Sequence, residues 1–140
     1  DLTEAAEDEL ALLRNWISYY KEKRDLLHSG KVVRTEHAES TAYVHGVVST
    51  DARQAVFMFA QLRPSQFSRP ANIRLTGLDA SSNYRVRLVE PAGPAAAMQL
   101  KPPHWYDGVT LSGATLATVG LKAPVLRPEQ AILIEASKVE

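Results

Sequence analysis

The chain has 140 residues, 45% of them hydrophobic, and 16 basic against 16 acidic side chains give a formal net charge of zero. Zero net charge argues against a nucleic-acid groove or an anionic membrane surface as the main partner, because both attract a basic excess. The absence of Cys excludes disulfides and cysteine-bound metal, and no apolar run approaches the about 18 residues of a membrane span.

The first 29 residues differ in composition from the rest. They contain neither Gly nor Pro, whereas seven Gly and eight Pro follow. We therefore predict one long amphipathic helix within residues 1–30 and a separate domain over 31–140. Thr3 is a candidate N-cap, acidic side chains crowd the first turns and basic ones the last turns, as the helix dipole favours. Gly30 is expected to end the helix in a left-handed conformation.

Two apolar stripes run along this predicted helix. The first stripe consists of Leu10, Leu13, Ile17, Tyr20 and Leu27, and the second of Leu12, Trp16, Tyr19 and Leu26. Together they cover about half of the circumference, whereas a surface helix needs an apolar face of only about 100°. The helix therefore lies either deep in its own domain or between two bodies, one of them outside this chain. On the second interpretation the interdomain packing residues are Leu10, Leu13, Trp16, Ile17, Tyr20 and Leu27.

After Gly30 the apolar pattern changes to the alternation of β-strands. The predicted strands are 31–36, 41–50, 55–62, 72–75, 84–88, 97–101, 109–111 and 132–136. Asp51 marks a turn that joins the second and third strands as a hairpin. Residues 112–120 suit either a strand or a turn of helix. The prolines fall in the connections. These features predict a mainly β fold, an antiparallel two-sheet β-sandwich of the Greek-key type behind one long N-terminal α-helix.

The chain lacks the usual signatures of catalysis and cofactor binding. It contains no HExxH, no glycine-rich phosphate loop and no GxSxG elbow, so we expect no cofactor, no metal and no catalytic residue here. Among the histidines, His37 and His45 are the pair that neighbouring strands could bring together. Local hydrogen bonds are the favoured role for both of them.

One short motif points to sugar binding. Trp105 and Tyr106 precede Asp107 in the sequence HWYDG. Exposed aromatic rings beside a polar group can stack on a sugar, although the same rings can also fill a core or a domain interface. Trp105, Tyr106 and Asp107 are therefore the candidate carbohydrate-binding residues, with the two rings as the platform.

Several ordered segments resemble melibiase-type α-galactosidases of glycoside hydrolase family 36. The matching pieces are WISYYKEKR at 16–24, LLHSG at 26–30, VVR at 32–34, VSTD at 48–51, AVF at 55–57, RLTGLD at 74–79, YRV at 84–86, SG at 112–113 and VGL at 119–121. The resemblance implies that the chain is the last helix of a catalytic (β/α)8 barrel followed by the C-terminal β-sandwich. It also implies a parent enzyme that hydrolyses terminal α-galactosides with retention. Its two catalytic aspartates would lie in the barrel and have no match here.

Three functions follow for testing. The first is a non-catalytic C-terminal domain that supports the barrel of the same parent chain, inactive alone and cytoplasmic by family habit and lack of Cys. The second is a carbohydrate-binding module built on the HWYDG rings. The third is an adhesion or oligomerisation sandwich. If the barrel is absent, we expect the helix to fold back on the sandwich or the fragment to self-associate.

Overall fold

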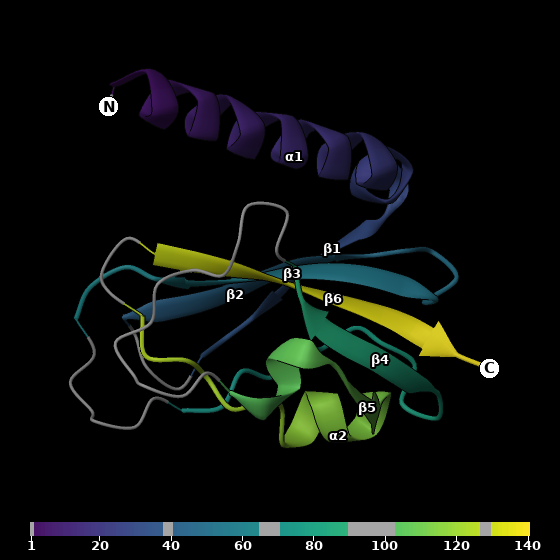
Figure 1. Ribbon diagram of the computed structural model, residues 1–140. Helices are drawn as coiled ribbons and strands as arrows, with labels where there is room; N and C mark the ends of the chain where they lie inside the picture. Colours follow the sequence, from purple (N-terminus) through teal and green to yellow (C-terminus); the bar gives the residue numbers. More distant parts are fainter. Residues whose placement is uncertain (1, 38–40, 65–70, 90–102, 127–129) are drawn as a thin grey trace.

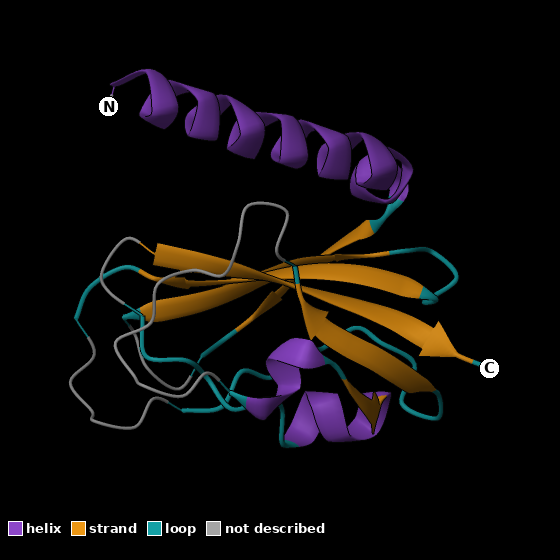
Figure 2. Ribbon diagram, in the orientation of Figure 1, coloured by secondary structure: helices purple, strands orange, loops and turns teal. Residues whose placement is uncertain are grey.

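A long helix and an antiparallel sheet account for most of the structure, a computed structural model that describes residues 2–37, 41–64, 71–89, 103–126 and 130–140. Helix α1 lies over one face of the sheet, and the short helices lie on the other side (Figures 1 and 2). The elements are α1 (Leu2–Ser29), β1 (Lys31–Thr35), β2 (Ala42–Val48), β3 (Gln54–Gln61), β4 (Asn83–Leu88), the 3-10 helix η1 (His104–Asp107), β5 (Val109–Ser112), α2 (Gly113–Thr118) and β6 (Gln130–Val139).

The six strands follow the order β1-β2-β3-β6-β4-β5, and every neighbouring pair is antiparallel. The first three strands form two successive hairpins. The last strand, β6, then enters between β3 and β4 and pairs with both along most of its length. The C-terminal strand is therefore central, and it joins the N-terminal half of the sheet to the rest.

The two faces of the sheet carry different side chains because residues alternate along each strand. On the core face the register aligns Phe57 of β3 with Ile134 of β6, and Leu88 of β4 lies on the other side of Ile134. Phe57, Ile134 and Val86 are fully buried. The opposite face carries Glu135 among other residues, and this is the face that α1 overlies (Figure 1).

The core face is closed by a layer with little regular structure. Leu116 of α2, Trp105 of η1 and the buried side chains of Ile73 and Leu75 belong to the hydrophobic core. Ile73 and Leu121 form one isolated antiparallel bridge. The mainly β, antiparallel architecture is thus confirmed. Among the described residues it consists of one sheet, and the facing layer of the expected sandwich holds α2, η1 and this bridge.

Most predicted strands are found within one or two residues of their expected bounds. The strand expected at 72–75 is reduced to the bridge at Ile73, and the one expected at 97–101 lies outside the described residues. Of residues 112–120, Gly113–Thr118 form helix α2, and the Ser112 hydroxyl caps it by accepting a hydrogen bond from the Thr115 backbone N–H at 3.1 Å.

Helix α1 runs from Leu2 to Ser29, within the predicted range, and Thr3 lies inside it rather than at its cap. The left-handed conformation expected of Gly30 is wrong, since its φ is not positive. A Cβ atom at this position would meet Val47, the Leu26 carbonyl and the Val48 carbonyl at less than 3 Å. Glycine is thus required for the close approach of α1 to β2. No described helix is both long and apolar enough to cross a membrane.

Tyr84 holds together two turns at one end of the sheet. Its ring is completely buried. Its hydroxyl donates to the carbonyl oxygen of Ala52 at 2.6 Å and accepts from the backbone N–H of Asp79 at 3.0 Å. Ala52 lies in the β2–β3 turn and has a φ of 56°, a conformation that costs a non-glycine residue energy. The Tyr84 hydroxyl therefore stabilises a strained turn that connects two core strands.

We expect Tyr84→Phe to lower the free energy of unfolding by about 1 to 3 kcal/mol, because two partly buried backbone hydrogen bonds are lost. Urea denaturation monitored by circular dichroism measures the change. Tyr43→Phe is the matched control, because Tyr43 is exposed on β2 and its substitution should leave the midpoint unchanged. Equal effects of the two variants would contradict this role of Tyr84.

Candidate functional site: the exposed face of α1 and its attachment to the sheet

One buried carboxylate attaches α1 to the sheet. Glu135 lies in β6 on the face that α1 overlies, and it is 9% exposed. Its Oε1 accepts a hydrogen bond from Lys23 Nζ at 3.3 Å. Its Oε2 accepts from the Tyr19 hydroxyl at 3.2 Å and from Arg87 Nη2 of β4 at 3.2 Å. Helix α1, β6 and β4 thus meet at a single charged group.

These contacts matter because a buried charge is costly when it is unpaired. Removing one partner of a buried ion pair typically costs about 3 to 5 kcal/mol, whereas the intact pair adds little net stability. The Glu135 cluster therefore specifies where α1 sits on the sheet. The pKa of Tyr19 is raised well above its usual value, first by burial and then by the negative charge of Glu135.

The sequence reasoning missed this cluster. Its signal is nonetheless present in the strand at 132–136, where Glu135 interrupts an apolar run (ILIEA). An acidic side chain within a predicted buried strand requires a basic or hydroxyl partner, because an isolated carboxylate is unstable there. Nothing in the sequence says that Lys23, which is 112 residues away, supplies that partner.

The two apolar stripes of α1 have different surroundings. Leu26 of the second stripe is buried and Tyr19 is partly buried, whereas Trp16 and Leu12 are 40% and 41% exposed. Trp16 lines a groove of about 370 Å³ together with Met58 of β3 and Leu133 of β6. The second stripe therefore faces the sheet, with closer packing near the C-terminal end of the helix.

The first stripe is largely uncovered. Leu10, Leu13, Ile17 and Tyr20 are 51%, 56%, 45% and 45% exposed, and only Leu27 is partly buried. Exposed apolar patches on a protein surface commonly mark interaction sites. Among the proposed packing residues Trp16 is also exposed, at 40%. The helix thus presents exposed apolar side chains from Leu10 to Tyr20, in its middle part.

The HWYDG rings lie in the core and not on the surface. Trp105 is 0% exposed, and its indole N–H donates to the Lys122 carbonyl oxygen at 2.7 Å. Tyr106 is also buried and packs edge-on against Trp105, with 4.9 Å between ring centroids. Asp107 is exposed. Of the two alternatives open for these rings, the filling of the core is the one found, and neither ring has a free face for a sugar in this structure.

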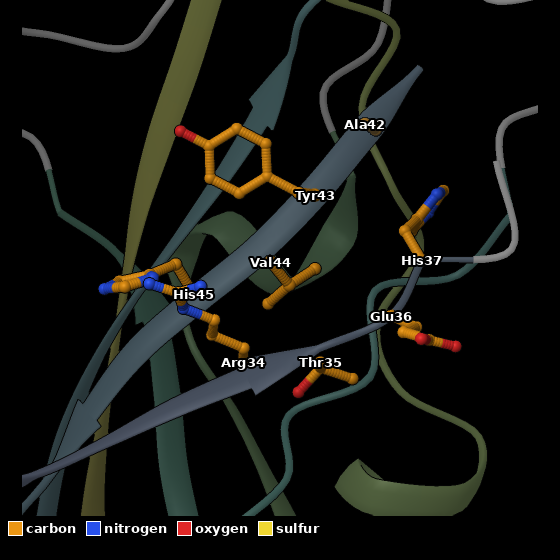
Figure 3. A pocket seen from close by; sticks show the side chains of 8 residues that line it. All are labelled: Arg34, Thr35, Glu36, His37, Ala42, Tyr43, Val44 and His45. Atoms are coloured by element: carbon orange, nitrogen blue, oxygen red, sulfur yellow. The ribbon is translucent and has the colours of Figure 1, made fainter. Parts of the chain in front are cut away.

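A hollow of about 580 Å³ lies at one end of the β1–β2 pair, and Figure 3 shows the side chains that line it. His45 is the cross-strand partner of Arg34. His37 lies at the other end of the hollow (Figure 3), where its ring packs near Phe59 and its Nε2 is hydrogen-bonded to the Ala71 carbonyl at 2.9 Å. The two histidines do not converge, and no metal-binding group of three or more His, Cys, Asp or Glu occurs among the described residues.

A model of the glycosyl hydrolase family 36 C-terminal domain matches residues 42–135, which is more than half of the chain. The chain belongs to this family. The matched region begins with β2 and ends in β6 at Glu135, so it includes β2 to β5 and the first part of β6 and leaves α1 and β1 outside.

Relatives of this family 36 domain are α-galactosidases of much greater length. The α-galactosidase of Escherichia coli is 37% identical over 127 residues, which cover 86% of this chain and 18% of the relative. The α-galactosidase structure from Lactobacillus brevis has a TM-score of 0.74 at 21% identity and covers 100% of this chain and 18% of that one. A Geobacillus stearothermophilus family 36 α-galactosidase variant, solved with raffinose, has a TM-score of 0.64 at 18% identity and covers 88% of this chain and 15% of that one.

Substitution of Trp105 and of Trp16 compares the stability contribution of a core tryptophan with that of a partly exposed one. We expect Trp105→Ala to lower the free energy of unfolding by about 3 to 5 kcal/mol, because it leaves a large cavity and an unpaired carbonyl. Trp16→Ala is the matched control. Its half-exposed ring leaves no closed cavity, so we expect less than half of that loss. Denaturant titration followed by circular dichroism provides both values, and a larger loss for Trp16 would contradict the core assignment of Trp105.

The raised pKa of Tyr19 predicts a loss of stability at high pH. The folded state holds the phenol proton more tightly than the unfolded state. Its contribution is therefore fully present below the unfolded pKa of about 10 and is lost as the pH rises above that value. Unfolding free energies measured between pH 8 and pH 11 should fall less steeply in Tyr19→Phe than in the wild type. Parallel pH profiles would show that Tyr19 titrates as freely in the folded as in the unfolded chain.

Proposed function

We propose that this chain is the non-catalytic C-terminal domain of an α-galactosidase and supports the catalytic (β/α)8 barrel of the same parent chain. The observation that carries the proposal is the uncovered first stripe of α1, in a domain whose family is shown and whose relatives are several times longer. The sheet holds one side of this helix, and the adjacent side is apolar and exposed. A second domain is needed to cover that adjacent side.

The way in which α1 is attached to the sheet supports a supporting, non-catalytic role for this domain. Glu135 receives hydrogen bonds from α1 and from β4, so its charge is committed to holding the helix in place. The sheet beneath is rigidly packed, with Phe57, Ile134 and Trp105 fully buried. A rigid sheet that fixes a helix by a buried charge is suited to positioning that helix for a neighbouring domain.

Terminal α-galactosides are the substrate class that we assign to the parent enzyme. The names of the relatives support this class, and the Geobacillus enzyme variant was solved with raffinose. The catalytic aspartates of such an enzyme would lie in the barrel. A sugar-binding role for the present domain has little support, because the Trp105 and Tyr106 rings are buried.

Substitutions in the first stripe test the supporting role in the intact α-galactosidase chain. We expect Leu13→Asp with Ile17→Asp to shorten the half-life of hydrolytic activity at raised temperature by about tenfold or more. That factor corresponds to about 1.4 kcal/mol, a modest loss for two carboxylates placed in an apolar interface. The control is Val119→Asp, an equally exposed apolar position after α2 on the far side of the sheet.

Two results would refute the supporting role. One is an unchanged half-life in the double variant. The other is hydrolysis of an aryl α-galactoside by the 140-residue chain alone, since catalysis would then reside in this domain. Saturable binding of galactose or raffinose to the 140-residue chain would instead favour the sugar-binding alternative.

A further inference from the structure

We infer that the catalytic barrel of the parent chain contacts this domain at a second place, the open face of β1 and β2, and presents a carboxylate to Arg34 and His45 there. This second contact rests on the proposed supporting role and adds to it a surface outside α1. It belongs to the intact enzyme, in which the barrel covers the first stripe of α1 at the same time.

Arg34 and His45 lie on the face of the sheet that α1 overlies. Arg34 pairs in register with His45, and the same row of register partners continues through Met58 to Leu133. Leu133 precedes Glu135 by two residues on β6, and residues two apart on a strand point to the same side of the sheet. A domain that meets α1 from outside therefore approaches the sheet from the side on which Arg34 and His45 lie.

Helix α1 leaves the β1–β2 end of this face open. Val32 is 57% exposed although it belongs to the same row of register partners as Glu135, and Tyr43 is 38% exposed. Arg34 is also exposed, and His45 is partly buried. Aromatic and arginine side chains are enriched in the interfaces between proteins. The open face therefore has the composition of a contact surface.

The charge of this face points to an acidic partner. Arg34 and His45 stand opposite each other, and their side chains lie together at one end of the hollow, whereas Glu36 lies at the other end (Figure 3). Two side chains that can both be positive are unfavourable neighbours across strands. The ion pairs found among the described residues do not include Arg34. A carboxylate from a neighbouring domain can accept charge-assisted hydrogen bonds from both side chains and removes this repulsion.

The rest of the parent chain is the partner that this face fits. The chain covers 18% of the Escherichia coli relative, so a parent of that length has most of its residues outside it. The opposite face of the sheet is packed against α2 and η1, which leaves the α1 side for a large neighbour (Figure 1). A second copy fits less well, because a symmetric pair through this face brings two Arg34–His45 pairs together.

Charge reversal in the intact α-galactosidase chain tests the contact. We expect Arg34→Glu to shorten the half-life of hydrolytic activity at raised temperature by about tenfold or more, because two carboxylates then face each other at the interface. Added salt should reduce this loss by screening the repulsion. The matched control is Lys122→Glu, the same change of charge at an exposed position directly after the Ile73–Leu121 bridge in the layer opposite α1, and it should leave the half-life unchanged. Circular dichroism verifies that both variants remain folded.

The result is separable from the test of the supporting role. If Arg34→Glu behaves like Lys122→Glu while Leu13→Asp with Ile17→Asp shortens the half-life, the contact at Arg34 is refuted and the supporting role stands. If neither Arg34→Glu nor the double variant shortens the half-life, both are refuted.

Cross-linking of the intact enzyme identifies the partner. A water-soluble carbodiimide joins a carboxylate to an amine that is in direct contact with it, and Arg34→Lys supplies such an amine on the open face. Mass spectrometry of the digested enzyme should find position 34 of this variant linked to an Asp or Glu of the barrel. Lys122 is the internal control, because its exposed amine lies in the layer opposite α1 and should form no link to the barrel. A position 34 that is linked only within these 140 residues, or not linked at all, overturns the proposal.

Discussion

The arrangement of the molecule depends on the contact between one carboxylate and three donors. Glu135 belongs to the central strand β6, and its partners Lys23 and Tyr19 come from α1 while Arg87 comes from β4. Because an unpaired carboxylate in this position is costly, every packing of α1 that separates it from Glu135 is disfavoured. The ion cluster therefore determines which side of the helix meets the sheet. The apolar groups nearby, such as Leu26, then contribute burial at that position.

Fixing one side of α1 also fixes which side remains open. The residues that touch the sheet and the exposed first stripe lie on adjacent sides of one helix, so burial of the one leaves the other accessible. A covering domain needs an apolar stripe that is held rigidly and faces outward. Helix α1 meets this need through contacts near its C-terminal end, where Gly30 lets it approach β2 closely.

Local patterns predicted the elements of this fold, and long-range contacts decided the rest. The strands were recognisable because side chains alternate on a half-buried sheet, and α1 because its apolar residues recur at helical spacing. The central position of β6 in the sheet could not be predicted, because the sequence of a strand near the chain end does not indicate which strands it pairs with. Trp105 shows the same limit. An aromatic residue beside polar neighbours looks alike whether it stacks on a ligand or, as here, points into the core toward the Lys122 carbonyl.

The candidate site divides in the same way. The apolar residues of α1 were identified from their periodicity, which is a property of one segment. The group that orients them, Glu135, is distant in sequence and acts only after the sheet has formed. A supporting domain is therefore recognised from two kinds of observation. Its contact surface is encoded locally in α1, whereas the rigidity that makes the surface useful comes from a core that includes Tyr84 and Trp105. Loss of the Tyr84 or Trp105 packing would leave the apolar surface of α1 in place but would no longer hold the helix in a fixed position.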